Sequence, residues 1–318
     1  MSSVTLVTGA AGFAGGHLLD LLVGEGTPVV AWRRPGGPPS RRWAADPRVR
    51  WADVELLDRE AVAAALADLR PAAVYHLAGA PHVGLSWANT REFYEANVRA
   101  THHLFEGLRR AGVAPRVLVS SSATVYKPAD RPLREDDPTG ATSPYGTSKL
   151  AQDLLCRAAW ESDGLPVLIA RAFNHTGPGQ DPSFVAPGIA RQVALIESGQ
   201  APPVLAMGNL EPKRDLTDVR DVVRGYRAMM AAATPGVPYN VCSGRPIAIR
   251  TLVDTFLART RVTIRIERDP ARFRPNDVPF LVGDHSRLTA DTGWRPEIPI
   301  DDTVDALLAY WRAEVARG

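Results

Sequence analysis

The sequence predicts an α/β fold with a doubly wound parallel sheet and a smaller α/β substrate-binding lobe. Three observations support this. Short apolar segments of strand length alternate with helical patterns over the first half of the chain. A glycine-rich turn directly follows the first of these segments. Beyond residue 172 the composition changes to segments punctuated by glycine and proline, and we expect the second lobe to begin there.

The expected strands lie at 4–7, 28–32, 49–51, 73–77, 116–120 and 167–170. Helical patterns cover 17–23, 91–111 and 145–162. We therefore assign 1–172 to a dinucleotide-binding domain that 214–243 rejoins, and 173–213 with 244–318 to the lobe.

The first strand runs into the turn Thr-Gly-Ala-Ala-Gly-Phe-Ala-Gly, residues 8–15, and then into a helix. Gly9 permits the tight turn, Gly12 lets the backbone approach a pyrophosphate, and Gly15 allows the helix to pack closely on the strand. Phe13 lies within the same turn and is also expected to contact the cofactor. The pattern predicts a Rossmann-type dinucleotide site, and a tight turn without a ligand is the alternative.

Arg33 and Arg34 directly follow the second strand, where an enzyme that uses NAD usually has an acid. Because arginine accommodates a 2′-phosphate, NADP(H) is favoured over NAD(H), with a solvated basic loop as the alternative. Leu77 ends the fourth expected strand and Ala78 follows it. Both are expected beneath the cofactor, although a close-packed turn explains them equally well.

Tyr145 and Lys149 stand four residues apart in the run Tyr-Gly-Thr-Ser-Lys, so on a helix they share one face. A fixed positive charge beside the phenol lowers the pKa of a tyrosine from about 10 toward the working range of a general acid. Ser122, and with it Thr124, lies at a strand end and can hydrogen-bond a substrate oxygen. These four residues are the expected catalytic group.

Composition excludes several other classes of function. The chain has 318 residues, 45% of them hydrophobic, and a formal net charge of +2 with no basic stripe, which argues against nucleic acid as a partner. No apolar run reaches membrane-spanning length, and no signal peptide is evident. The two cysteines share no metal-ligand spacing, so we expect no metal site. We expect the protein to lie in the cytoplasm.

Three further runs carry a resemblance to a known family. They are 171–180 (RAFNHTGPGQ), 208–221 (GNLEPKRDLTDVRD) and 274–279 (RPNDVP). Together with the glycine turn and Tyr-x-x-x-Lys, the chain resembles the extended short-chain dehydrogenase/reductase family over almost its whole length. Within the nucleotide-sugar branch, it is most similar to the GDP-4-keto-6-deoxy-mannose reductases, which are relatives of GDP-mannose 4,6-dehydratase.

The resemblance implies further site residues. Asp53 fits the acid that contacts adenine, although an exposed aspartate at a helix entry is an equally plain explanation. Asn174, Arg214 and Arg274 would contact the diphosphate of a nucleotide sugar, for which a GDP-linked substrate is favoured. The other substrate contacts would come from Arg191, Ser86 and Asp277, with a loop-capping role as the alternative for Asp277. For Arg171, Arg191 and Arg220, an ordinary surface ion pair is the alternative. The helices at 92–111 and 145–162 resemble those that form a homodimer.

The position two residues after Ser122 indicates the type of reaction. Dehydratase relatives have a glutamate there, whereas Thr124 cannot act as a carboxylate at neutral pH. We therefore expect NADPH-dependent reduction of the 4-keto group of a nucleotide-linked 4-keto-6-deoxy-hexose. The alternatives are a nucleotide-sugar 4-epimerase with tightly bound NAD and a non-catalytic dinucleotide sensor.

Overall fold

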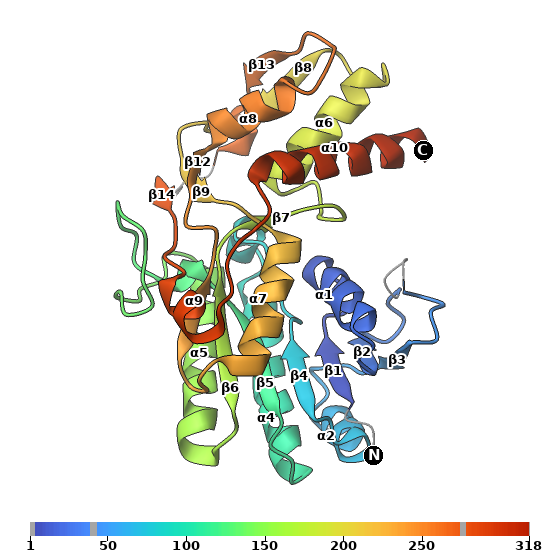
Figure 1. Ribbon diagram of the computed structural model, residues 1–318, viewed down its shortest axis with the longest axis vertical. Coiled ribbons are helices and arrows are strands. Elements are labelled where there is room, and N and C mark those ends of the chain that lie inside the picture. The colour runs from blue at the N-terminus through green and yellow to red at the C-terminus, as the bar shows by residue number, and fades with distance from the viewer. Residues whose placement is uncertain (1–3, 39–42, 274–277, 318) are drawn as a thin grey trace.

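Seven parallel strands form the main sheet, in the order β11-β6-β5-β4-β1-β2-β3 (Figure 1). They are β1 (Thr5–Thr8), β2 (Val29–Arg33), β3 (Val49–Asp53), β4 (Ala73–His76), β5 (Arg116–Ser122), β6 (Val167–Ala172) and β11 (Pro238–Val241). The computed structural model describes residues 4–38, 43–273 and 278–317. The strand order changes direction at β1, so the predicted doubly wound sheet is confirmed.

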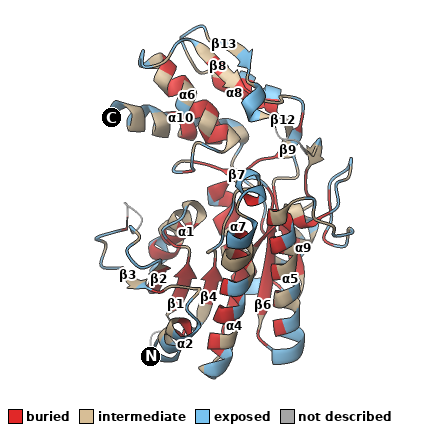
Figure 2. Ribbon diagram, turned by 180° about the vertical axis from the view of Figure 1, so that it is seen from behind, coloured by how far each residue is buried: buried red, intermediate tan, exposed pale blue. Residues whose placement is uncertain are grey.

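Helices cover both faces of this sheet. One face carries α1 (Phe13–Gly24), α7 (Val219–Ala232) and α9 (Ser286–Thr292). The other carries α2 (Arg59–Leu69), α4 (Ala100–Arg110) and α5 (Pro144–Asp163). Successive side chains of a strand point to opposite faces, and helices cover both faces here, so most residues of the inner strands are buried (Figure 2).

The helix expected at 91–111 is divided in the structure. It consists of α3 (Thr90–Tyr94), a π turn η2 (Glu95–Arg99) and α4. The π turn carries the fully buried Asn97, which accepts a hydrogen bond from the backbone N–H of Ala80 (2.9 Å). The interruption thus ties this helix to the loop that follows β4.

The smaller lobe lies beyond the carboxyl ends of the strands (Figure 1). It is built from α6 (Val185–Glu197), β8 (Val204–Met207), β9 (Lys213–Asp215), β12 (Pro246–Ala248), α8 (Ile249–Leu257), β13 (Arg265–Arg268), β14 (Phe280–Leu281) and α10 (Ile300–Arg317). Its own apolar core joins α6, α8 and α10 to β8. The short strands β7 (His175–Thr176) and β10 (Thr217–Asp218) pair where the chain passes between the two parts.

The predicted return of 214–243 to the sheet corresponds to α7 and β11. We assigned all of 244–318 to the lobe, but the segment that contains α9 lies elsewhere. Its Leu288 and Trp294 pack in the core beneath α1 and α7. The remaining short turns are η1 (Gly84–Trp87), η3 (Ala123–Val125) and η4 (Pro270–Arg272). Across the described ranges, no helix is both long and apolar enough to cross a membrane.

Candidate active site

The predicted site residues gather at one edge of the sheet. The glycine turn follows β1, Leu77 follows β4, Ser122 ends β5, and Asn174 lies shortly beyond β6. Parallel strands bring their carboxyl ends to a common edge, and ligands of doubly wound sheets bind there at the switch point of the strand order. Segments that are far apart in the sequence therefore form one site between the sheet and the lobe.

The glycine turn has the predicted backbone geometry. Gly9 has a φ of +69°, and a Cβ there would lie 2.6 Å from the backbone nitrogen of Ala78. A Cβ on Gly15 would overlap the carbonyl oxygen of Gly9 and lie 2.8 Å from the Cα of Ala10. The turn therefore packs against the loop after β4 on one side and against its own helix on the other.

The start of α1 fits a dinucleotide pyrophosphate. The N-cap residue is Gly12, no side chain caps the helix, and the first turn contains no acidic residue. The backbone N–H groups and the positive end of the helix dipole thus remain available to an anion. A Cβ on Gly12 would meet only the oxygen of Gly9, at 3.1 Å.

Leu77 and Ala78 adjoin this turn. The Leu77 N–H donates to the carbonyl oxygen of Thr8 (3.2 Å), and the Ala78 N–H donates to the Thr8 hydroxyl (3.4 Å). The close-packed turn that we kept as an alternative is therefore present. A cofactor contact by these two residues stays a prediction.

Arg33 and Asp53 stand opposite each other at the ends of β2 and β3. The Nε of Arg33 donates to Oδ1 of Asp53 (2.5 Å), with side chains that are 26% and 46% exposed. Arg34 is 81% exposed, and its Nε lies 3.9 Å from a carboxylate oxygen of Glu55. Two residues that the sequence assigned to separate cofactor contacts thus form one ion pair, which leaves other guanidinium N–H groups of Arg33 available to an anion.

Ser122, Thr124 and Tyr145 form the candidate catalytic group. The Oγ of Ser122 accepts hydrogen bonds from the backbone N–H (3.2 Å) and the hydroxyl (3.0 Å) of Thr124. With both acceptor positions of that oxygen engaged, its own proton remains to be donated. The side chains of Ser122 and Tyr145 are in hydrogen-bond contact.

The pKa of Tyr145 differs from our expectation. Burial raises it above its ordinary value, and the hydrogen bond with Ser122 opposes this rise. The expected lowering by Lys149 is wrong for this structure, because the ammonium group donates instead to the carbonyl oxygen of Ser120 (2.8 Å) and to Oε1 of Gln152 (3.0 Å). Tyr145 is therefore protonated at neutral pH, as a proton donor must be.

Lys149 is itself strongly perturbed. Burial lowers its pKa to about 8, against the opposing attraction of the Asp153 carboxylate one helical turn further along α5. Asp153 in turn forms an ion pair with Arg171, from Nε to Oδ2 at 2.8 Å, with both side chains almost completely buried. The ion pair that we kept as an alternative for Arg171 is therefore present, but inside the protein and not at its surface. Arg220 forms an ion pair with Asp218.

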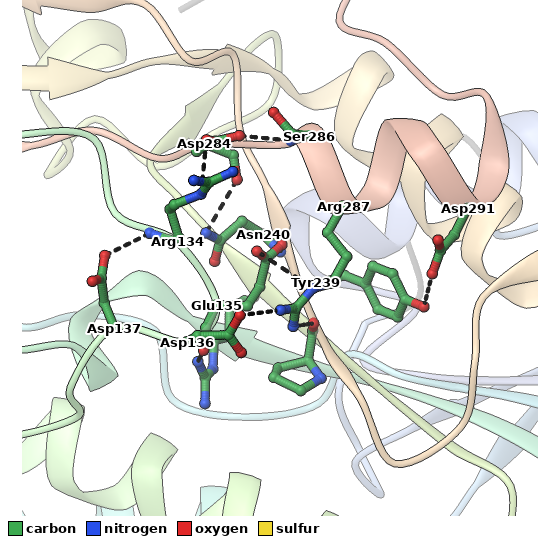
Figure 3. A network of polar contacts seen from close by, with 12 residues as sticks. Arg134, Glu135, Asp136, Asp137, Tyr239, Asn240, Asp284, Ser286, Arg287 and Asp291 are labelled. Atoms are coloured by element: carbon green, nitrogen blue, oxygen red, sulfur yellow. Dashed lines mark hydrogen bonds and ion pairs between the residues drawn. The ribbon is translucent and has the colours of Figure 1, made fainter.

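The loop between Thr124 and α5 is fixed by a polar network (Figure 3). The Glu135 carboxylate accepts the backbone N–H of Asn240 (2.9 Å), and the Asn240 side-chain amide donates to the carbonyl oxygen of Leu133 (2.8 Å). Arg287 of α9 donates to Asp136 (2.6 Å) in the same loop. These contacts attach the loop to β11 and α9, and so restrain the segment between the serine and the tyrosine.

The predicted substrate residues fall into three groups. The exposed Asn174 and the exposed Arg191 of α6 lie on the lobe side of the sheet edge, and Arg214 is half-buried on β9. Ser86 is completely buried and its hydroxyl donates to the carbonyl oxygen of Val83 (2.7 Å), so its predicted substrate contact is not supported. Arg274 and Asp277 lie outside the described residues.

Sequence reasoning missed the polar residues behind Lys149. Gln152 and Asp153 are buried on α5, and Thr101 and His76 are buried opposite them. The one sequence signal was the presence of Gln152 and Asp153 within a helix already expected to face the core. Their partners lie on other elements and could not be named in advance.

Comparisons with known proteins cover nearly the whole chain. The family model described as GDP-mannose 4,6 dehydratase matches residues 6–307. A GDP-6-deoxy-D-mannose reductase from Pseudomonas aeruginosa is 34% identical over 318 residues, which are 99% of each chain. A UDP-glucose 4-epimerase from Azospirillum brasilense is 32% identical, covering 97% of this chain and 92% of that protein. The solved structure of RMD from Pseudomonas aeruginosa complexed with NADPH has a TM-score of 0.87 and 32% identity, covering 98% of this chain and 99% of that one.

The sheet, the glycine turn and the Ser122, Tyr145 and Lys149 group define the class, which is an enzyme of the extended short-chain dehydrogenase/reductase type. Within this class the chain belongs to the GDP-mannose 4,6-dehydratase family.

Proposed function

We propose that this protein reduces the 4-keto group of GDP-4-keto-6-deoxy-mannose with NADPH. The observation that carries the proposal is a buried, protonated Tyr145 in contact with Ser122, close to an uncapped helix that suits a pyrophosphate. The similarity to a GDP-6-deoxy-D-mannose reductase supports the substrate. The relative with NADPH in its structure supports the cofactor.

The cofactor would be held along the carboxyl edge of the sheet. Gly12 and Phe13 at the start of α1 would receive the pyrophosphate, with Gly9 and Gly15 forming the turn around it. At the adenosine end, the remaining N–H groups of Arg33 would bind a 2′-phosphate. Arg34 is exposed beside it and would add a second positive charge, while Asp53 keeps Arg33 in place.

NADPH bound there would supply the hydride for carbon 4 of the sugar. Tyr145 would donate its phenolic proton to the carbonyl oxygen as negative charge develops on it. Ser122 would hydrogen-bond the same oxygen, with Thr124 orienting Ser122 through two hydrogen bonds. Lys149 would bring its charge to the nicotinamide ribose beside Tyr145.

The nucleotide sugar would bind between this edge and the lobe. Asn174, Arg191 and Arg214 are our candidates for its phosphates, and Arg274 and Asp277 remain predictions from the sequence. An arginine guanidinium matches phosphate oxygens with two parallel hydrogen bonds, and an amide adds a donor without charge. Loss of Arg214 should therefore raise KM more than it lowers kcat.

The experiment is an assay of purified protein with freshly prepared GDP-4-keto-6-deoxy-mannose and either NADPH or NADH, following the loss of reduced-nicotinamide absorbance. Rapid oxidation of NADPH and slower oxidation of NADH would support the proposal. Oxidation that requires the sugar and is abolished in Tyr145→Phe would assign the reaction to this site.

A 4-epimerase is the second candidate, supported by the 32% identity to a UDP-glucose 4-epimerase. It predicts no net oxidation of NADPH, release of NAD when the protein is denatured, and interconversion of UDP-glucose and UDP-galactose. Interconversion of the two UDP-sugars, together with either the absence of NADPH oxidation or the release of NAD, would replace the reductase proposal.

We propose that the protein is a homodimer formed through α4 and α5. Leu154 and Trp160 on α5 are 58% and 38% exposed, which is unusual for large apolar side chains on one helix. Sedimentation of the parent and of Leu154→Glu tests this. Both cysteines are free and buried, which agrees with the reducing cytoplasm as the proposed location.

A further inference from the structure

The ammonium group of Lys149 has two acceptors within the protein. It donates to the carbonyl oxygen of Ser120 (2.8 Å) and to Oε1 of Gln152 (3.0 Å). An ammonium group has three donors and no acceptor, so the atom of Gln152 that faces it must be the oxygen. One N–H of Lys149 is therefore left, and the two fixed bonds determine its direction.

The amide of Gln152 is in turn held by Thr101 of α4. Gln152 Nε2 donates to the Thr101 hydroxyl oxygen (2.7 Å), and that hydroxyl donates its own proton to the carbonyl oxygen of Asn97 in the π turn (2.7 Å). Gln152, Thr101 and Asn97 are all completely buried. Reversing the amide would bring an N–H against Lys149 and an acceptor against Thr101, so its orientation is determined.

His76 of β4 completes the chain of hydrogen bonds. Because the Thr101 proton is engaged, His76 Nε2 is the donor to Thr101 (3.0 Å), and Nδ1 accepts from the Thr8 hydroxyl (2.7 Å). Burial and the charge of Lys149 lower the pKa of His76 to about 3, so the ring is neutral. Thr8 directly precedes the glycine turn, and the chain therefore links Lys149 to the strand that carries that turn.

We propose that Gln152 is a positioning residue that aims the free N–H of Lys149 at the cofactor, with Thr101 and His76 fixing its amide. Gln152 is too deeply buried to touch the substrate and acts only through Lys149. An amide does not pass a proton along such a chain, so its role is geometric and electrostatic. The assignment of Lys149 to the reaction rests on the proposed function.

Within the part of the chain that the structure describes, the other ionisable groups around Lys149 come from three elements. On α5 they are Tyr145, Asp153 and Cys156, of which the phenol and the thiol are neutral because burial raises their pKa values. His76 on β4 is neutral as well. Asp153, paired with Arg171 of β6, is thus the neighbouring anion, and it is present in every variant below.

Two variants of nearly equal size test the proposal in opposite directions. Gln152→Met removes an acceptor from the charged form of Lys149, so the pKa of Lys149 should fall by about one unit. Gln152→Glu places a carboxylate there, so that pKa should rise by at least a similar amount. A structural role alone would lower stability in both variants without separating their titrations.

The lysine can be titrated directly, because the chain has three lysines and two of them, Lys127 and Lys213, are exposed. NMR of protein labelled with ¹³C at the lysine side chains, without cofactor, should resolve Lys149 from these two reference signals. This readout does not depend on the reaction, so it tests Gln152 even if the reductase assay fails. Unchanged titration of Lys149 in both variants would overturn the proposal.

A kinetic test of the same variants measures the pH dependence of kcat for keto-sugar reduction. Because the charged form of Lys149 is lost as the pH rises through its pKa, the alkaline fall in kcat should move to lower pH in Gln152→Met and to higher pH in Gln152→Glu. We also expect roughly 10-fold lower kcat at neutral pH in Gln152→Met, from misplacement of Lys149.

Variants of Thr101 test the same chain of hydrogen bonds at a second residue and include a matched control. Thr101→Val should shift the Lys149 titration in the same direction as Gln152→Met, while Thr101→Ser keeps the hydroxyl and should restore it. Thr303→Val makes the same change at another completely buried threonine, which bonds Asp218 (2.8 Å), and should leave Lys149 unchanged. A shift in Thr303→Val as large as in Thr101→Val would contradict the specific role.

Discussion

Removing Asp153 should strongly destabilise the protein, because it would leave the charge of Arg171 buried without its counter-ion. The two side chains are 1% and 2% exposed, and their ion pair measures 2.8 Å. Among the described residues, the other hydrogen-bond partners of Arg171 are neutral: the Tyr126 hydroxyl (2.9 Å) and the carbonyl oxygen of Glu135 (3.1 Å). Breaking a buried pair on one side typically costs about 3–5 kcal/mol, so we expect a cost of this size for Asp153→Leu. For a chain of this length it corresponds to a fall of roughly 5–8 °C in the thermal midpoint.

The assay is urea and thermal unfolding of Asp153→Leu, Arg171→Met and the double variant. The double variant should be more stable than Asp153→Leu alone, because it no longer buries an unpaired charge. As a control, Glu197→Gln breaks the more exposed pair with Arg312 (2.7 Å) and should cost no more than about 1 kcal/mol. The reasoning fails if Asp153→Leu lies within about 1 kcal/mol of the parent, or if the two single effects simply add in the double variant.

Four further outcomes can be measured. Tyr145→Phe should lower kcat at least about 100-fold while the Kd for NADPH stays near that of the parent; near-full turnover would remove Tyr145 from its role. Arg33→Ala should raise KM for NADPH by about 10-fold or more with little effect on NADH, and an equal effect on both would exclude a 2′-phosphate contact. Burial lowers the pKa of His76 from 6.5 to about 3, so stability should be fully retained above pH 6.5 and decrease as the pH falls toward 3, by an amount that His76→Gln reduces. Gly15→Ala should weaken NADPH binding and cost about 1–3 kcal/mol through overlap with the turn, whereas Gly24→Ala, with no atom within 4 Å of its added Cβ, should be tolerated.

Features that depend on residues close together in the sequence were predictable from it. The glycine turn lies between a strand and a helix as expected, and the positive φ of Gly9 follows from what such a turn requires. Tyr145 and Lys149 share one face of α5 because four residues make about one helical turn. The alternation of strands and helices was sufficient for the doubly wound sheet, since parallel strands need crossover helices.

The π turn was not predictable, because nothing local in 91–111 distinguishes it from a continuous helix. Its position became meaningful only through Asn97, which bonds the loop after β4. The same applies to Ser86, whose resemblance-based assignment to the substrate did not reveal that its hydroxyl is turned into its own loop. In both cases the deciding contact depends on how the chain folds back.

The sequence by itself thus determined the class of fold, the glycine turn and the candidates for the catalytic group, because each depends on the spacing of residues within one or two turns or strands. Only the tertiary structure decided the electrostatics of that group. Burial raises the pKa of Tyr145, Lys149 is directed at Ser120 and Gln152, and Arg171 lies inside the protein beside Asp153. The physical reason is that a pKa and the direction of a hydrogen bond depend on desolvation and on partners from distant segments, and the packing of whole elements brings those together.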